Sequence, residues 1–421
     1  MDPAQAPAFL RTRLSIMMFL EFFLWGAWYV TMGPYLANNG MGDVNKWAYS
    51  VGPIAAIISP FFLGLIADRF FATERVLGLM QLIGGAALCA APWAVGQNST
   101  LFLVMLSVHM LCYMPTLGLT NTLAFHNMTN SEKQFPLIRV WGTIGWIVAG
   151  VTLSRLKWDT SVDMFYLAGG SGILMGLYSF TLPHTPPPAK GQAFSAREAL
   201  GLDALVLLKK RSFAVFILCS FLICIPLAAY YARAGEFAGA MGIEKIGQTM
   251  SYGQMSEILF MVVMPLFFAR LGVKWMLLVG MAAWVARYGL FAGAASDSVK
   301  WMVIAGIVLH GICYDFFFVT GQIYVDNEAD PKIRGQAQGF LVLVTQGLGM
   351  FIGAQIIGEL VKMNTTGEGD LAVIDWKQVW MVPCIFAGVI MVIFFLFFRD
   401  PGRKSKAGVP AVDEMDERTT M

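Results

Sequence analysis

One stretch of this sequence, FPLIRVWGTIGW at 135–146, combines apolar character with groups that can bind a small molecule. Arg139 lies within the apolar run that the stretch begins, and a cation at membrane depth costs about 3 kcal/mol on insertion scales. We therefore expect Arg139 to face a protein interior or a wet cavity. Arg139, Thr143 and Trp146 are spaced i, i+4, i+7, which puts a guanidinium, a hydroxyl and an aromatic ring on one helical face. The alternative is an arginine that caps the end of a neighbouring helix.

Two carboxyl groups lie in other apolar runs, Glu257 in SYGQMSEILFMVVMP and Asp315 in YDFFF. Gln254 is expected on the same helical face as Glu257, and His310 and Tyr314 share a face beside Asp315. Burial disfavours a charged carboxylate, whereas a nearby cation favours it. A carboxylate whose cationic partner changes with conformation can therefore couple proton binding to movement.

Arg139 and Arg287 are the cations predicted to face these carboxylates from other helices. The alternative for both carboxylates is permanent ion pairing that only holds helices together. Further polar residues within apolar runs have two interpretations each. Glu21 contacts a transport path or is structural, and Thr116, Thr120 and Asn121 line a cavity or bond helix to helix. The aromatic residues near Glu21 are interpreted as membrane-interface anchors; they are Trp25, Trp28 and Tyr29. Arg233 and Glu236 are interpreted as a local ion pair.

The composition identifies the class of protein that must position these groups. The chain has 421 residues, of which 57% are hydrophobic and 13% charged, and its mean hydropathy is +0.63. Soluble domains contain about 25% charged residues, so the sequence predicts an all-α membrane protein. The six cysteines lie in apolar runs without metal-ligand spacing, and the four histidines are scattered, so no metal and no cofactor is predicted.

Twelve apolar segments are long enough to cross a bilayer, which takes about 20 residues. They lie at 14–37, 47–68, 76–95, 101–125, 136–155, 162–183, 213–237, 247–269, 275–295, 300–325, 335–361 and 377–398. The sequence therefore predicts twelve transmembrane helices in two six-helix bundles, 1–183 and 213–398. A Pro-rich and then basic cytoplasmic linker with a short surface helix is predicted at 184–212, and a polar cytoplasmic tail at 399–421.

The basic residues predict the orientation of the chain. With both termini in the cytoplasm, nineteen of the 29 lysines and arginines lie on the cytoplasmic side, seven lie outside and three lie within segments. We also expect the first helix to be retained, because no small-residue cleavage site follows it.

The turn after the second segment reads GLIADRFFATERVL at 64–77. Gly64, Asp68 and Arg69 resemble the loop signature of the major facilitator superfamily, with the next basic residue, Arg75, delayed by an insert. In this arrangement Asp68 can cap a neighbouring helix start, and Arg69 can pair across the cytoplasmic seam. A charged turn that only follows the charge rule explains the arginines but not the order of Gly, Asp and Arg.

Several blocks together resemble the nucleoside:proton symporter family of this superfamily, the bacterial nucleoside and xanthosine permeases. The blocks include FLWGAW at 23–28, YMPTLGLTNT at 113–122, FPLIRVWGTIGW at 135–146, QMSEILF at 254–260, AWVARYGLFA at 283–292 and YDFFF at 314–318. The resemblance implies a nucleoside between the two halves of the chain. It assigns substrate contacts to Arg139, Thr143, Trp146, Gln254, Glu257, His310 and Tyr314, and it makes Asp315, beside Glu257, the leading residue for proton coupling.

Some positions depart from the family pattern. Where the family offers amide side chains, this chain has Ala228 and Tyr231, so Tyr231 joins the candidate substrate contacts. His310 replaces an aromatic residue, and Trp146 and Tyr314 stand where phenylalanine is usual. These departures leave the class unchanged and the preferred base open.

The resemblance implies secondary active import of nucleosides by proton symport, in a multi-pass protein of the bacterial inner membrane. We expect a monomer in the lipid bilayer, with nucleosides and protons as partners and no nucleic acid. A sugar or a drug is the alternative substrate. A membrane sensor or enzyme is the alternative class, but the sequence has no enzyme motif, and the tail after Arg399 is too short for a signalling domain.

Overall fold

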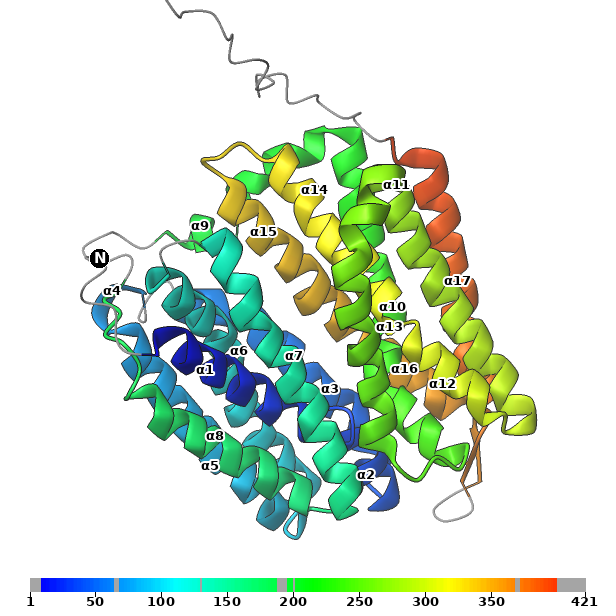
Figure 1. Cartoon of the computed structure of the whole chain (residues 1–421). Helices are drawn as coiled ribbons and strands as arrows, with labels where there is room; N and C mark the ends of the chain where they lie inside the picture. Colours follow the sequence, from blue (N-terminus) through cyan, green and yellow to red (C-terminus); the bar gives the residue numbers. More distant parts are fainter. Residues whose placement is uncertain are drawn as a thin grey trace, which may run out of the picture.

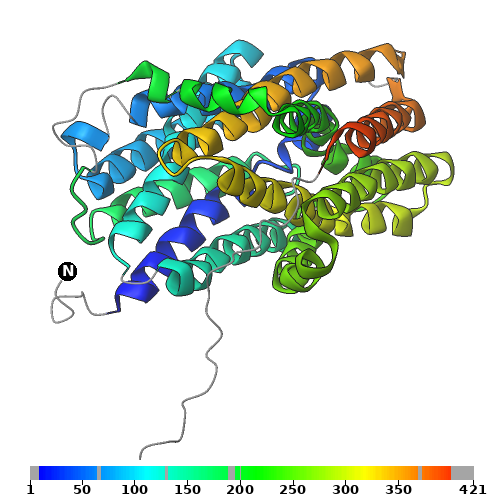
Figure 2. The same ribbon diagram turned by 90° about the horizontal axis from the view of Figure 1, so that it is seen from above.

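The computed structural model describes residues 9–63, 68–128, 131–187, 195–199, 201–367 and 372–399. Two groups of helices stand side by side, one formed by the first part of the chain and the other by the second (Figure 1). The view from above shows the same division (Figure 2). We call these groups the N-half and the C-half.

The N-half contains the elements up to residue 179. They are α1 (Leu10–Gly26), α2 (Met32–Asn38), the 3₁₀ turn η2 (Gly42–Val44), α3 (Asn45–Phe62), α4 (Asp68–Phe70), α5 (Thr73–Val95), α6 (Ser99–His126), α7 (Ser131–Leu156) and α8 (Asp163–Ser179). Glycines let α5 and α8 approach closely, since a Cβ atom on Gly85 would lie 2.7 Å from the carbonyl oxygen of Gly169. Asn98 caps α6 by accepting a hydrogen bond from the amide of Leu101 at 2.8 Å.

Two elements lie between the halves, α9 (Ala196–Ala199) and the 3₁₀ helix η4 (Leu202–Lys209). The elements of the C-half are α10 (Arg211–Ala240), α11 (Ile246–Asp297), α12 (Lys300–Val308), α13 (His310–Tyr314), the π-helical η5 (Asp315–Val319), α14 (Thr320–Glu328), α15 (Arg334–Val342), the π-helical η6 (Leu343–Gly349), α16 (Met350–Met363), β1 (Thr365–Thr366), β2 (Val373–Ile374) and α17 (Trp376–Phe397). The two strands pair antiparallel as a small hairpin. The predicted surface helix of the linker corresponds to α9 and η4, where Arg197 pairs with Asp203 and lowers the pKa of that carboxyl group.

The all-α membrane fold predicted from the sequence is confirmed. By length and composition, eight helices among the described residues are able to cross a membrane. One of them, α11, contains two of the predicted segments, and its helical path breaks at Gly272, where φ is 68° and glycine is favoured. The count of twelve spans and the bundle boundaries 1–183 and 213–398 stay predictions.

The first predicted segment, 14–37, is not one helix. Helix α1 ends at Gly26 and α2 begins at Met32, so the chain leaves the helical path between them. A side chain from α3 holds this break: the hydroxyl of Tyr49 donates to the carbonyl oxygen of Tyr29 at 2.8 Å and accepts from the amide of Gly33 at 3.1 Å. Apolar composition continues through the break and therefore could not reveal it.

The two ends of the bundle are named here by their elements. The hairpin end carries α2, the α7–α8 turn and the β1–β2 hairpin, and the linker end carries α4, α9 and η4 (Figure 1). Gly64 and the side chain of Asp68 lie outside the described residues, so the loop signature is described only through the helical backbone of α4 and Arg69.

Candidate functional site

Arg139 lies on α7, where this helix packs against α1. Its guanidinium carbon is 4.0 Å from the centroid of the Phe22 ring, a cation–π contact from α1. A Cβ atom on Gly142 would approach both groups within 2.7 Å, so the glycine makes room for the stacked pair. Among the described residues no hydrogen bond joins Arg139 to a helix-end carbonyl, which disfavours the capping interpretation.

Trp146, two helical turns after Arg139, belongs to an aromatic wall. Trp25 of α1 lies 5.3 Å from Trp146 and 5.5 Å from both Tyr113 and Tyr29, measured between ring centroids. Tyr29 continues this wall to Tyr231 of α10 at 5.7 Å, and therefore across to the C-half. A nucleobase can stack on such rings.

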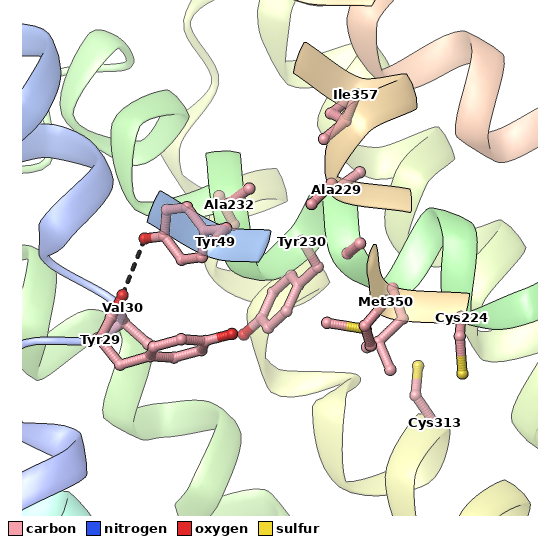
Figure 3. Packing of buried hydrophobic residues seen from close by; sticks show 14 of the residues in the cluster. Tyr29, Val30, Tyr49, Cys224, Ala229, Tyr230, Ala232, Cys313, Met350 and Ile357 are labelled. Carbon is pink, nitrogen blue, oxygen red and sulfur yellow. Dashed lines mark hydrogen bonds between the residues drawn. The ribbon is translucent and has the colours of Figure 1, made fainter. Parts of the chain in front are cut away.

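The interpretation of Trp28 and Tyr29 as membrane-interface anchors is wrong. Trp28 is fully buried and Tyr29 is 6% exposed, because both pack inside the bundle. Figure 3 shows Tyr29 extending toward Tyr230 of the C-half. Aromatic side chains near a segment end look alike in sequence whether they face lipid or protein, so only packing separates the two cases.

The charged and polar candidates of the C-half gather opposite Arg139. Glu257 lies close enough to Arg139 for the two charges to interact. Tyr314 lies within electrostatic reach of Glu257, Arg139 and Asp315, and Tyr231 within reach of Tyr314 and Glu257. The structure thus brings candidates from α7, α10, α11, α13 and η5 to one region between the halves.

One hydroxyl residue and one amide residue complete this region of candidate substrate contacts. Thr143, one turn after Arg139 on α7, and Gln254, one turn before Glu257 on α11, are each 8% exposed. The side-chain oxygen of Gln254 is buried and accepts no hydrogen bond among the described residues. A buried amide oxygen without a donor is an available acceptor for a ligand.

Arg287 determines how His310 presents its ring. A guanidinium nitrogen of Arg287 lies 3.2 Å from Nδ1 of His310, its Nε donates to the carbonyl oxygen of Gly306 at 3.0 Å, and its charge lies 4.1 Å above the Tyr230 ring. A guanidinium has only donors, so Nδ1 must accept and the ring proton must sit on Nε2. His310 is therefore a neutral ring that can donate one hydrogen bond from Nε2.

Asp315 is fully buried, and both of its carboxylate oxygens are without a hydrogen-bond partner in the described part of the chain. The alternative interpretation, a permanent ion pair between Asp315 and Arg287, is wrong, because the arginine contacts His310, Gly306 and Tyr230 instead. Asp315 begins the π-helical segment η5, a local form that is frequent at functional sites. The predicted local pair between Arg233 and Glu236 is present at 2.7 Å.

The hairpin end of the candidate site is closed by contacts between the halves. Asp159, in the α7–α8 turn, accepts hydrogen bonds from the Gly247 amide of α11 at 2.6 Å and from Ser154 Oγ at 2.7 Å. Ser154 Oγ also accepts a hydrogen bond from the backbone amide of Gln248 at 2.9 Å. Burial raises the pKa of the Asp159 carboxyl group above its ordinary value.

A second set of contacts closes the same end between α3 and α16. Lys46 forms an ion pair with Glu359, and the side-chain amide of Gln355 donates a hydrogen bond to Ser50 Oγ at 2.8 Å. A cavity of about 550 Å³ is lined by residues of α2, α10, β2 and the starts of α11 and α17. No candidate substrate-binding or proton-coupling residue lines it.

These features define a membrane transporter of the major facilitator superfamily fold, with polar groups between two helical halves. Residues 9–403 match the model of the nucleoside H+ symporter family, so the chain belongs to this family. The protein is thus a proton-coupled nucleoside transporter and not an enzyme, and a sugar or a drug as substrate is not favoured.

Individual relatives agree with this assignment. The chain is 38% identical over 404 residues to the putative nucleoside transporter YegT of Escherichia coli K12, covering 92% of this chain and 93% of that protein. It is 33% identical to the xanthosine permease of the same organism, covering 92% and 95%. The crystal structure of the nucleoside transporter NupG superposes with a TM-score of 0.82 at 30% identity, covering 93% of this chain and all of that chain.

Proposed function

We propose that the nucleoside binds between the halves, held from α7 by Arg139 and from the C-half by Gln254, Glu257 and Tyr314. The observation that carries this proposal is the meeting of Arg139 and Glu257, which come from opposite halves and lie within electrostatic reach. A nucleoside offers hydroxyl groups and a base edge to these donors and acceptors. His310, Thr143, Trp146 and Tyr231 complete the proposed contacts, with His310 as a donor from Nε2.

Proton coupling is assigned to Asp315 and Glu257. Asp315 is buried without a hydrogen-bond partner among the described residues, and it lies within electrostatic reach of Glu257. Two nearby carboxyl groups disfavour simultaneous ionisation, so one of them holds a proton readily. Glu257 also interacts with Arg139, which links the protonation of the pair to the proposed substrate site.

The linker end is assigned to the cytoplasm of a bacterial inner membrane, with both termini on that side. The support is the distribution of the 29 basic residues, nineteen of which fall on that side by the predicted spans. The state described then has its outer end closed. The functional unit is assigned as a monomer. It consists of two bundles, 1–183 and 213–398, which are joined by the 184–212 linker and followed by the 399–421 tail. Gly64, Asp68 and Arg69 are assigned to the conformational loop between the second and third spans.

The test is nucleoside uptake by the purified protein in liposomes, driven by a pH gradient and measured across a panel of nucleosides. Arg139→Ala should lower nucleoside affinity by about 10-fold or more, because charge-assisted hydrogen bonds are lost. Arg155→Ala is the matched control, since Arg155 lies on the same helix but is exposed near its end. Normal binding by Arg139→Ala, or an equal loss in Arg155→Ala, would contradict the assigned site.

A further inference from the structure

Glu21 of α1 lies in a polar cluster formed within the N-half. It is fully buried, as are its neighbours Gln81 of α5 and Thr116 of α6. The Gln81 amide nitrogen lies 2.7 Å from Oε2 of Glu21 and 3.1 Å from Oγ1 of Thr116. Thr116 Oγ1 lies 2.6 Å from Oε1 of Glu21 and 2.5 Å from the carbonyl oxygen of Tyr113.

These four contacts require four hydrogens. Gln81 supplies two from its amide, and Thr116 supplies one from its hydroxyl. The Tyr113 carbonyl can only accept, so the hydroxyl hydrogen of Thr116 must point to it. The contact between Thr116 Oγ1 and Oε1 of Glu21 then has no hydrogen unless the carboxyl group carries one.

The conclusion does not depend on which way the Gln81 amide is turned. If its oxygen and nitrogen were exchanged, the amide oxygen would face Oε2 of Glu21, and that contact would also need a hydrogen from the carboxyl group. The surrounding charges agree with a neutral group, since no ion pair in the described ranges includes Glu21. Thr116 is thereby shown to bond helix to helix rather than to line a cavity.

We propose that Glu21 is a proton-binding site of the N-half, which holds its proton as a neutral carboxylic acid and does not release it during transport. Among the described residues, the hydrogen-bond partners of its side chain lie on α5 and α6, in the same half as α1. Alternating access largely moves one half against the other as rigid bodies, so it would not open this cluster. The site is therefore separate from Asp315 and Glu257; its exclusion from transport rests on the proposed function, whereas its protonation does not.

Infrared spectroscopy of the full-length protein tests the protonation directly. The difference between wild type and Glu21→Gln should contain the carbonyl band of a protonated carboxylic acid, and this band should not change between pH about 6 and 8. Thr116→Val should shift the band, because it removes a hydrogen-bond partner. The absence of such a band, or a carboxylate band in its place, would overturn the proposal whether or not the protein transports nucleosides.

Substitutions test whether the proton is retained. Glu21→Gln replaces the O–H donor by an N–H donor, so its unfolding temperature and its accumulation driven by a pH gradient should match wild type. Glu21→Ala removes the acceptor of one Gln81 amide hydrogen and leaves a cavity, so it should lower the unfolding temperature by about 5 °C. Misfolding of Glu21→Gln, or loss of its pH-driven accumulation while nucleoside binding persists, would overturn the proposal.

Discussion

A methyl group at position 150 should disfavour closure of the hairpin end. Gly150 of α7 faces the first turn of α11 across the boundary between the halves. A Cβ atom there would overlap Ser251 Oγ, and it would lie 2.6 Å from the carbonyl oxygen and 3.1 Å from the carbonyl carbon of Gly247. Two of these three atoms belong to the backbone, so a rotamer change of Ser251 cannot relieve the overlap.

The cost of Gly150→Ala follows from the size of this overlap. Inserting a methyl group where the backbone must shift costs about 1–3 kcal/mol. Only the closed state bears this cost, so the ratio of closed to open protein should fall by about 5- to 150-fold. The same shift would lengthen the hydrogen bond from the Gly247 amide to Asp159.

Cysteine labelling measures this equilibrium. A cysteine placed at Gln248, next to the closing contacts, should react faster with a membrane-impermeant maleimide in Gly150→Ala than in the parent protein. Gly170→Ala on α8 is the matched control, because a Cβ atom at Gly170 meets no atom within 4 Å. It controls for the higher helix propensity of alanine. Equal labelling rates in Gly150→Ala and Gly170→Ala would refute the reasoning.

Three further outcomes are expected. Asp315→Asn should still bind nucleoside, within about 3-fold of wild type, yet lose accumulation driven by a pH gradient; wild-type pH dependence of uptake would exclude Asp315 as the coupling site. His310→Gln keeps a donor near the position of Nε2 and should bind nucleoside better than His310→Asn by about 10-fold in a binding assay, and the reverse order would refute the assigned tautomer. Burial raises the pKa of Asp159 in the closed state, so closure should strengthen as the pH falls through that pKa and weaken above it. In Gln248→Cys, the labelling rate relative to that of an exposed cysteine at the same pH should therefore fall on acidification, but not when Asp159→Asn is added. A ratio that is independent of pH in Gln248→Cys alone would contradict this.

The sequence predicted the fold well because lipid imposes a simple rule on composition. A spanning segment must be apolar and helical, so hydropathy locates it without knowledge of its neighbours. Hydropathy does not detect local changes of the backbone within an apolar segment. The break between α1 and α2 and the π-helical segments η5 and η6 lie within continuous apolar runs, where no change of composition marks them.

Residue type predicted which side chains the structure brings together better than it predicted how they pair. The structure brings Arg139, Glu257, Tyr314 and Asp315 together, as their cost in lipid suggested. It does not pair Asp315 with Arg287, because the arginine finds a carbonyl oxygen, an imidazole and an aromatic ring on nearby elements. Charge alone predicts an ionic partner, and neutral partners of this kind leave no signal in residue spacing.

Two groups between the halves bear on how the proposed site works. Inside the halves, the Glu21 carboxyl group is bonded, as are Nε and one terminal nitrogen of Arg287. Between the halves, the Gln254 oxygen and the Asp315 carboxylate have no partner among the described residues. An unpartnered buried polar group costs about 1–3 kcal/mol, so at the proposed site a ligand with both donors and acceptors, and a proton, would each stabilise this region. On this proposal a nucleoside and a proton meet these two needs together, which would couple their binding without a direct contact between them.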